Sequence, residues 1–162
     1  MSTSRQSLAG SSNRILRALA PDDLARLEPD LEAVDLNFRQ RLQEQNRVIK
    51  YVYFIDRGLA SVVAIGRDRR QAEVAIVGYE GLTGIAAILD AHRSPCEIFM
   101  QVEGKGRRIE VGKLADALDI SRELRSSISR AIYVFAVQTS FNALAAAQGK
   151  LEERLARWLL MA

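Results

Sequence analysis

The sequence of 162 residues contains one cysteine, one histidine and three prolines, and it has no long run of apolar residues. The single cysteine, Cys96, excludes an internal disulfide framework and favours a reducing, cytoplasmic compartment. No stretch reaches the ~18 consecutive apolar residues of a membrane span, so we expect no membrane partner. Metal sites need about three or four ligands, which His92 and Cys96 cannot supply, so we predict no metal site and no iron–sulfur cluster.

The groups needed for catalysis are also scarce. There is no nucleophile motif of the G-x-S-x-G type and no pair of carboxylates at a recognisable spacing. The only histidine, His92, falls in a predicted loop rather than beside a nucleophile. We therefore expect a protein that is not an enzyme.

The net charge of +3 is unevenly distributed. Residues 1–120 contain 17 basic and 17 acidic side chains, whereas residues 121–162 contain 6 basic and 3 acidic ones. A DNA-binding surface normally gathers a larger positive charge on one face. These residues alone are therefore not expected to bind DNA.

The amino-terminal part predicts two short helices after a polar segment. Residues 1–12 are rich in serine and are expected to be disordered. Asn13 is a candidate N-cap for a helix over 13–20, and Pro21 with the acidic residues after it suits the first turn of a second helix.

From about residue 33 to 111 the composition is that of β-strands. Five segments rich in valine, isoleucine, tyrosine and phenylalanine are predicted as strands, at 47–55, 60–65, 72–77, 97–103 and 107–111. Turn-forming residues separate them at 56–58, 66–70 and 104–106. Their spacing of about eight to twelve residues is typical of antiparallel sandwiches and barrels.

Residues 121–148 predict one long helix, capped by Ser121, with two apolar stripes. One stripe consists of Leu124, Ile128, Ala131 and Phe135, and the other of Val134, Val137, Phe141 and Leu144. A helix with two apolar stripes needs two packing partners, so we expect one to pack on the chain's own barrel and the other on a second copy. We assign the dimer interface to Ile128, Phe135 and Asn142.

This order of elements resembles the sensor half of the CRP/FNR family of bacterial transcription regulators. The resemblance rests on four phrases in sequence order: NRILRALAPDDLARLEPDLEAVDL, VYFIDRGLASVV, EVAIVGYEGLTG and GKLEERLARWLLM. It implies a mainly β fold, a double-stranded β-helix or jelly roll, with short amino-terminal helices and a long carboxy-terminal dimerisation helix. The implied domains are a sensor at 13–120, a dimerisation helix at 121–148, and at 149–162 a hinge with the start of a DNA-binding domain.

The resemblance also assigns a phosphate cradle to residues 81–94. Glycines let backbone N–H groups approach an anion, and an arginine supplies its counter-charge. The family pattern matches Gly81, Gly84, Arg93 and Ser94, with Thr83 between the glycines. Leu82 stands where the family has the glutamate that binds the ribose, and Pro95 stands where it has an alanine. The alternatives are a structural loop that binds nothing and a salt bridge from Arg93 to Glu97, to Asp90 or to a residue on the long helix.

The expected ligand is therefore a cyclic nucleotide or another small anion, and no cofactor is assigned with certainty. Thr139 and Ser140 are candidate contacts to a purine base, on the strength of the resemblance. Because Leu82 cannot accept a hydrogen bond from the ribose, we expect weak or absent binding of cyclic AMP, and we expect Leu82→Glu to restore it.

Two functions are open at this point. The first is the effector-sensing and dimerisation region of a transcription regulator, which forms homodimers and contacts DNA only through a helix-turn-helix domain that these residues lack. The second is a free-standing dimeric interaction module of the same fold that binds no small ligand.

Overall fold

The computed structural model describes residues 10–148 and Leu159, and the segments 1–9 and 149–162, apart from Leu159, lie outside it. In chain order the elements are α1 (Arg14–Arg17), α2 (Pro21–Leu27), a 3-10 turn (Glu28–Asp30), β1 (Glu32–Leu36), β2 (Arg41–Gln43), β3 (Tyr51–Ile65), β4 (Gln71–Val77), α3 (Ile85–Ile88), β5 (Cys96–Glu110), α4 (Val111–Ile120) and α5 (Arg122–Gln148). None of the described helices is long and apolar enough to cross a membrane.

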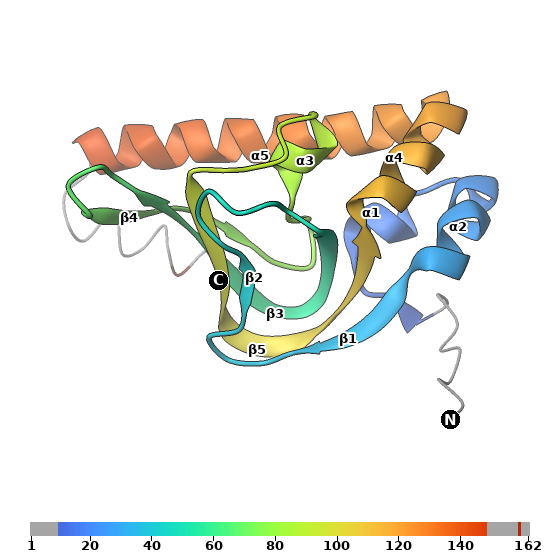
Figure 1. The fold of residues 1–162 in the computed structure, drawn as a ribbon, viewed down its shortest axis with the longest axis horizontal. Helices are drawn as coiled ribbons and strands as arrows, with labels where there is room; N and C mark the ends of the chain where they lie inside the picture. The colour runs from blue at the N-terminus through green and yellow to red at the C-terminus, as the bar shows by residue number, and fades with distance from the viewer. Residues whose placement is uncertain (1–9, 149–158, 160–162) are drawn as a thin grey trace.

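The strands form an antiparallel sheet with the order β1-β5-β3-β4, and β2 pairs with another part of β5. The sheet curves strongly, with α5 lying along one side of it and α1, α2 and α4 at one end (Figure 1). This architecture confirms the predicted mainly β, jelly-roll-like fold with short amino-terminal helices and one long helix after the sheet.

The strand boundaries differ from the sequence prediction. Residues 56–58 and 104–106 were predicted as turns, but they lie inside the 15-residue strands β3 and β5. The register between β3 and β5 shifts at Arg57 and Leu59, and Gly58 has φ 94°. At Gly104 the backbone of Arg57 approaches so closely that no side chain would fit. The glycines therefore bend two continuous strands rather than end them.

Two apolar clusters lie on opposite faces of β3, as the alternation of side chains along a strand requires. The first cluster lies beneath α1, α2, α4 and the start of α5, and it contains Leu16, Val52, Phe54, Ile109 and Leu124. The second contains Tyr53, Ile55, Ala60, Val62 and Met100, and Phe135 of α5 packs against it. The predicted stripe that begins at Leu124 therefore packs on the chain's own sheet.

The predicted caps are confirmed at both ends of the domain. Asn13 Oδ1 accepts hydrogen bonds from the backbone N–H groups of Ile15 and Leu16 at the start of α1. Ser121 Oγ accepts from the N–H of Leu124 at the start of α5. Both serve N–H groups that have no partner within their own helix.

Candidate functional site: the Gly81–Ser94 segment and its supports

Gly81 to Gly84 run alongside β3 and are bonded to it. Leu82 forms a bridge with Phe54, and Thr83 exchanges hydrogen bonds with Tyr53: its N–H donates to the Tyr53 carbonyl at 3.0 Å, and its Oγ1 accepts from the Tyr53 N–H at 3.1 Å. The N–H of Gly81 donates to the carbonyl of Gly78 at 3.1 Å. The N–H groups of Gly81 and Thr83 are therefore already hydrogen-bonded within the protein.

Leu82 is a core residue. Its side chain is 3% exposed and belongs to the first apolar cluster, together with Leu16 and Phe54. Leu82, which was expected at the ribose-binding position of the cradle, is thus a buried side chain in this structure. A glutamate at this position would enter apolar surroundings, where a carboxylate is strongly disfavoured.

Gly84 adopts the left-handed conformation, with φ 73°, immediately before the short helix α3. A Cβ atom at this position would lie 3.0 Å from Cγ2 of Val52. Glycine is therefore required here by backbone conformation and by space. This requirement explains the predicted glycine without any ligand.

Arg93, near the carboxy-terminal end of the segment, contacts a different part of the chain from Gly81–Gly84. Arg93 pairs with Val48 in an isolated bridge, whereas Thr83 bonds to Tyr53. The guanidinium of Arg93 is exposed and its Nη1 donates to the carbonyl of Asn46 at 3.4 Å. Within the described part of the chain, Arg93 forms none of the expected ion pairs, and Glu97 pairs with Arg41 at 3.1 Å.

Ser94 takes part in the same local structure. Its Oγ accepts from the N–H of Cys96 at 3.1 Å, and its carbonyl accepts from the N–H of Asn46 at 2.7 Å. The structure thus places Gly81–Gly84 beside one part of the 46–54 segment and Arg93–Ser94 beside another.

Little open space adjoins the glycine end of the segment. A cavity of about 30 Å³ lies between this loop and α5, lined among others by Gly81, Leu82, Val134 and Phe135. That volume is about the share of one water molecule in the liquid, whereas small-molecule sites are commonly ~300–1,000 Å³.

Thr139 and Ser140 face different sides of α5. Thr139 is half-buried and follows Phe135 by one turn, on the side that packs against the sheet. Ser140 is exposed. Both hydroxyls donate to α5 carbonyls four residues earlier, each at 2.9 Å. Of the two candidate base contacts, only Thr139 is therefore directed toward the sheet.

The residues assigned to the dimer interface also lie against the chain's own sheet. Ile128 is 1% exposed and belongs to the first apolar cluster, so its side chain has no surface left for a partner. Phe135 is half-buried against the second cluster. Asn142 Nδ2 donates to the carbonyl of Val74 in β4 at 3.2 Å. The other predicted stripe is the exposed one, with Val134 at 63% and Leu144 at 49%.

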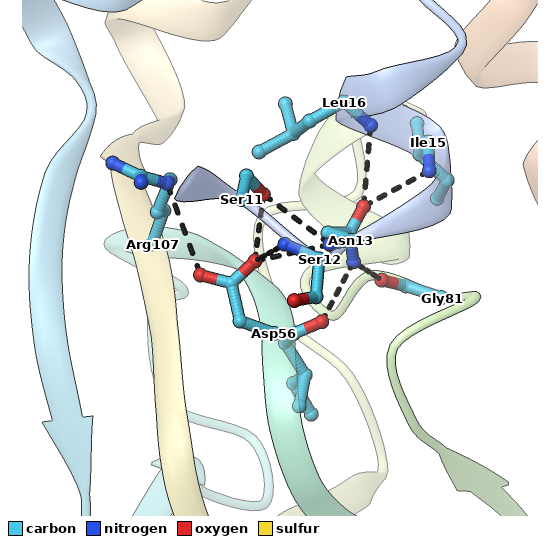
Figure 2. A network of polar contacts seen from close by, with 9 residues as sticks. Ser11, Ser12, Asn13, Ile15, Leu16, Asp56, Gly81 and Arg107 are labelled. Carbon is cyan, nitrogen blue, oxygen red and sulfur yellow. Dashed lines mark hydrogen bonds and ion pairs between the residues drawn. The ribbon is translucent and has the colours of Figure 1, made fainter. Parts of the chain in front are cut away.

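A polar network centred on the buried Asn13 ties this loop to residues 11–13 (Figure 2). Asn13 is fully buried, and its Nδ2 donates to the carbonyls of Ile55 at 3.0 Å and Gly81 at 2.9 Å. Asp56 Oδ1 accepts from Ser11 Oγ at 2.6 Å and from the N–H groups of Ser12 and Asn13. Residues 11 and 12, expected to be disordered, are thus held in place.

The buried guanidinium of Arg107 completes the network, with its Nε 3.8 Å from Oδ2 of Asp56 (Figure 2). Sequence reasoning found Asn13 only as a helix cap and missed Asp56 and Arg107. The only signal in the sequence is Asp56 itself, which directly follows an apolar run at a position predicted as a turn. In space, the network connects α1, β3, β5 and the Gly81 loop.

No group of three or more potential metal ligands occurs among residues 10–148 and Leu159. The segment 149–158 and 160–162, assigned to a hinge and a DNA-binding helix, lies outside the described residues.

The curved antiparallel sheet with a helix along it has the fold of a cyclic-nucleotide-binding-type roll, as the similarity to solved structures shows. No family model matches the sequence, and no curated protein matches it. Solved structures do match. One is a protein of Eubacterium rectale assigned to the crp/fnr family of transcriptional regulators, with TM-score 0.76 and 9% identity over 91% of this chain and 69% of that one.

Two further structures are similar over 86% of this chain, each with TM-score 0.70. The c-di-GMP-responsive global regulator CLP of Xanthomonas campestris is 14% identical, with 70% of its chain covered. A cyclic nucleotide-binding domain from Methylobacillus flagellatus is 12% identical, with 84% of its chain covered. At these identities the similarity establishes the fold.

Proposed function

We propose that this chain is the effector-sensing and dimerisation region of a bacterial CRP/FNR-type transcription regulator that acts in the cytoplasm. The fold and the resemblance in sequence order support this assignment. The observation that carries the dimerisation part is the exposed apolar stripe of α5. DNA contact is assigned to a helix-turn-helix domain outside these residues.

The exposed stripe has the spacing of a coiled-coil seam. Val134, Val137, Phe141 and Leu144 follow one another at intervals of three, four and three residues, and they are 63, 36, 51 and 49% exposed. This is the a/d pattern of two helices packed along a common axis. The opposite stripe is already buried on the sheet, so a second copy of α5 is the partner that suits the seam.

Sedimentation equilibrium tests the seam with matched variants. We expect the wild type to be a dimer at micromolar concentration. Val134→Glu places two carboxylates in the seam and should weaken association by a factor of about 100 or more. Val102→Glu, at a valine of similar exposure on β5, should leave the dimer intact. A monomeric wild type, or a dimer unaffected by Val134→Glu, would contradict the proposal.

We further propose that the cradle is degenerate, with weak or no binding of cyclic AMP. The support is the internal bonding of Gly81 and Thr83, the burial of Leu82 and the small cavity beside them. Arg93, which would supply the counter-charge, is exposed beside Asn46.

Thermal unfolding with 1 mM cyclic AMP, roughly a saturating concentration for a micromolar site, tests this part. A ligand at about 1,000 times its dissociation constant raises the free energy of unfolding by about 4 kcal/mol. For a domain of this size, this raises the midpoint of thermal unfolding by about 8–16 °C. We expect cyclic AMP to raise the unfolding midpoint by less than about 3 °C. A shift of about 8 °C or more would show that the site opens.

The free-standing interaction module is the second candidate, and the closed cradle favours it. Both candidates predict the α5 dimer, but only a regulator occupies specific promoters. Chromatin immunoprecipitation of the protein expressed from its own locus distinguishes them, since discrete peaks support the regulator and their absence supports the module.

A further inference from the structure

An open hollow of about 400 Å³ lies on the opposite side of β5 from the second apolar cluster. It is lined by residues from the turn between β1 and β2, from β2 and from β5: Phe38, Arg39, Arg41, Glu97, Phe99 and Gln101. These residues define the β2–β5 hollow. It shares no lining residue with the Gly81–Ser94 segment, and its volume lies within the ~300–1,000 Å³ of small-molecule sites.

Strand alternation supplies the floor of the hollow. Ile98 and Met100 are buried in the second apolar cluster, so Glu97, Phe99 and Gln101 point to the other face of β5. Phe99 is only half-buried there. An aromatic ring thus forms part of the floor, between a carboxylate and a carboxamide.

The turn that bears Phe38 is held rigidly over this floor. The N–H of Arg39 donates to the carbonyl of Met100, and the N–H of Met100 donates to the carbonyl of Gln40, both at 2.9 Å. Arg39 is in the left-handed conformation, with φ 61°, which is unfavourable for a residue with a side chain. The result is a phenylalanine that is 59% exposed with the Arg39 guanidinium 5.4 Å from its ring centroid.

The charges of the hollow do not cancel. Arg41 Nε is 3.1 Å from a carboxylate oxygen of Glu97, and this pair is neutral. Arg39 therefore leaves the hollow with one excess positive charge. In addition, Gln101 Oε1 is buried without a hydrogen-bond partner among the described residues. Gln101 also lines the hollow, and the last torsion of a glutamine side chain is soft.

We propose that the β2–β5 hollow binds a planar aromatic acid that also carries an O–H or N–H donor. The ring packs against Phe38 and Phe99, the acid faces the Arg39 guanidinium, and the donor reaches Gln101 Oε1. Aromatic faces, a cation and one acceptor are the few converging groups that fix orientation in such sites. The hollow gives this roll a small-molecule site apart from the cradle.

The probe for this proposal is 4-hydroxybenzoate, which carries all three features. It is titrated into the full chain and followed by NMR through the amide signals of residues 38–41 and 97–101. We expect saturable shifts confined to these residues, with a dissociation constant of about 1 mM or lower, as suits a ligand of roughly ten heavy atoms. Cyclohexanecarboxylate lacks both the aromatic ring and the O–H donor, and 4-hydroxybenzyl alcohol lacks the acid, so each should bind at least about fivefold more weakly.

Variants on exposed positions test the site without threatening the fold. Phe38→Ala removes the ring, and Arg39→Gly removes the cation while relieving the left-handed strain. Each should weaken binding at least about fivefold. Tyr79→Ala, at an aromatic residue of similar exposure (52%) outside the hollow, should leave it unchanged.

Three results would overturn the proposal: no saturable shift at the hollow up to about 10 mM probe, equal binding of all three compounds, or binding that survives both variants. The dimer and cyclic AMP experiments use other residues, so they succeed or fail independently of this one.

Discussion

Replacing Leu82 with glutamate tests whether the side chain at position 82 faces a ligand or lies in the apolar core. If the side chain at this position faces a ribose, the carboxylate restores a missing contact and cyclic AMP binding improves. In the structure, Leu82 is 3% exposed within an apolar cluster, so the carboxyl group would instead be buried among Leu16, Phe54 and their neighbours. The structure therefore predicts a loss of stability and no gain of binding.

The magnitude follows from two contributions. Burying a leucine side chain contributes about 2–3 kcal/mol, which the variant forfeits. A buried carboxyl group must also stay protonated, and doing so at pH 7 against an ordinary pKa of about 4.3 costs about 4 kcal/mol. The expected loss is about 6–7 kcal/mol at pH 7, a large part of the ~5–15 kcal/mol that a domain has in total.

The pH dependence has a definite sign. Burial in the folded state raises the pKa of the carboxyl group that Leu82→Glu introduces, so stability is retained below the unfolded pKa and lost as pH rises above it. Near pH 4 the deficit of the variant relative to the wild type should shrink to about 2–3 kcal/mol.

Urea denaturation of the wild type, Leu82→Glu and the volume-conserving Leu82→Met at pH 4 and 7 measures these differences. Leu82→Met should cost less than about 1.5 kcal/mol. A Leu82→Glu variant as stable as the wild type at pH 7, with tighter cyclic AMP binding by calorimetry, would refute the burial argument.

Further predictions concern the free energy of unfolding in urea. Gly84→Ala should destabilise by about 1–2 kcal/mol because of the left-handed backbone, whereas Gly112→Ala, in a helix with open space around it, should stabilise by about 0.5–1 kcal/mol. Asn13→Asp keeps the helix-cap acceptor but loses both donated bonds, so a loss of about 2–4 kcal/mol is expected, while Ser12→Ala should change little. Arg93→Ala should stay within about 0.5 kcal/mol, and a larger loss would show a buried role.

Local chemistry was sufficient to predict several elements. Asn13 and Ser121 cap helices through hydrogen bonds to residues two or three positions later, so sequence alone locates them. The two stripes of α5 follow from helical periodicity, and the structure buries one and exposes the other. The overall order of helices, sheet and long helix was also predicted, because the periodicity of apolar residues differs between helices and strands.

Partners far apart in the sequence decided the rest. Whether Gly104 ends a strand or bends one depends on the approach of Arg57, which lies on the neighbouring strand β3. Whether Ile128 or Val134 faces outward depends on which side of α5 meets the sheet.

In the candidate site, too, the sequence determined some features and the tertiary structure decided others. The sequence by itself determined which residues could form a cradle, namely two glycines, a threonine, an arginine and a serine. Only the tertiary structure decided that Thr83 bonds to Tyr53, that Leu82 enters the core and that Arg93 reaches Asn46. The reason is that each of these contacts joins two segments that are far apart in the sequence. The local pattern of one segment indicates which of its side chains can be buried or hydrogen-bonded, but not which distant residue they will meet.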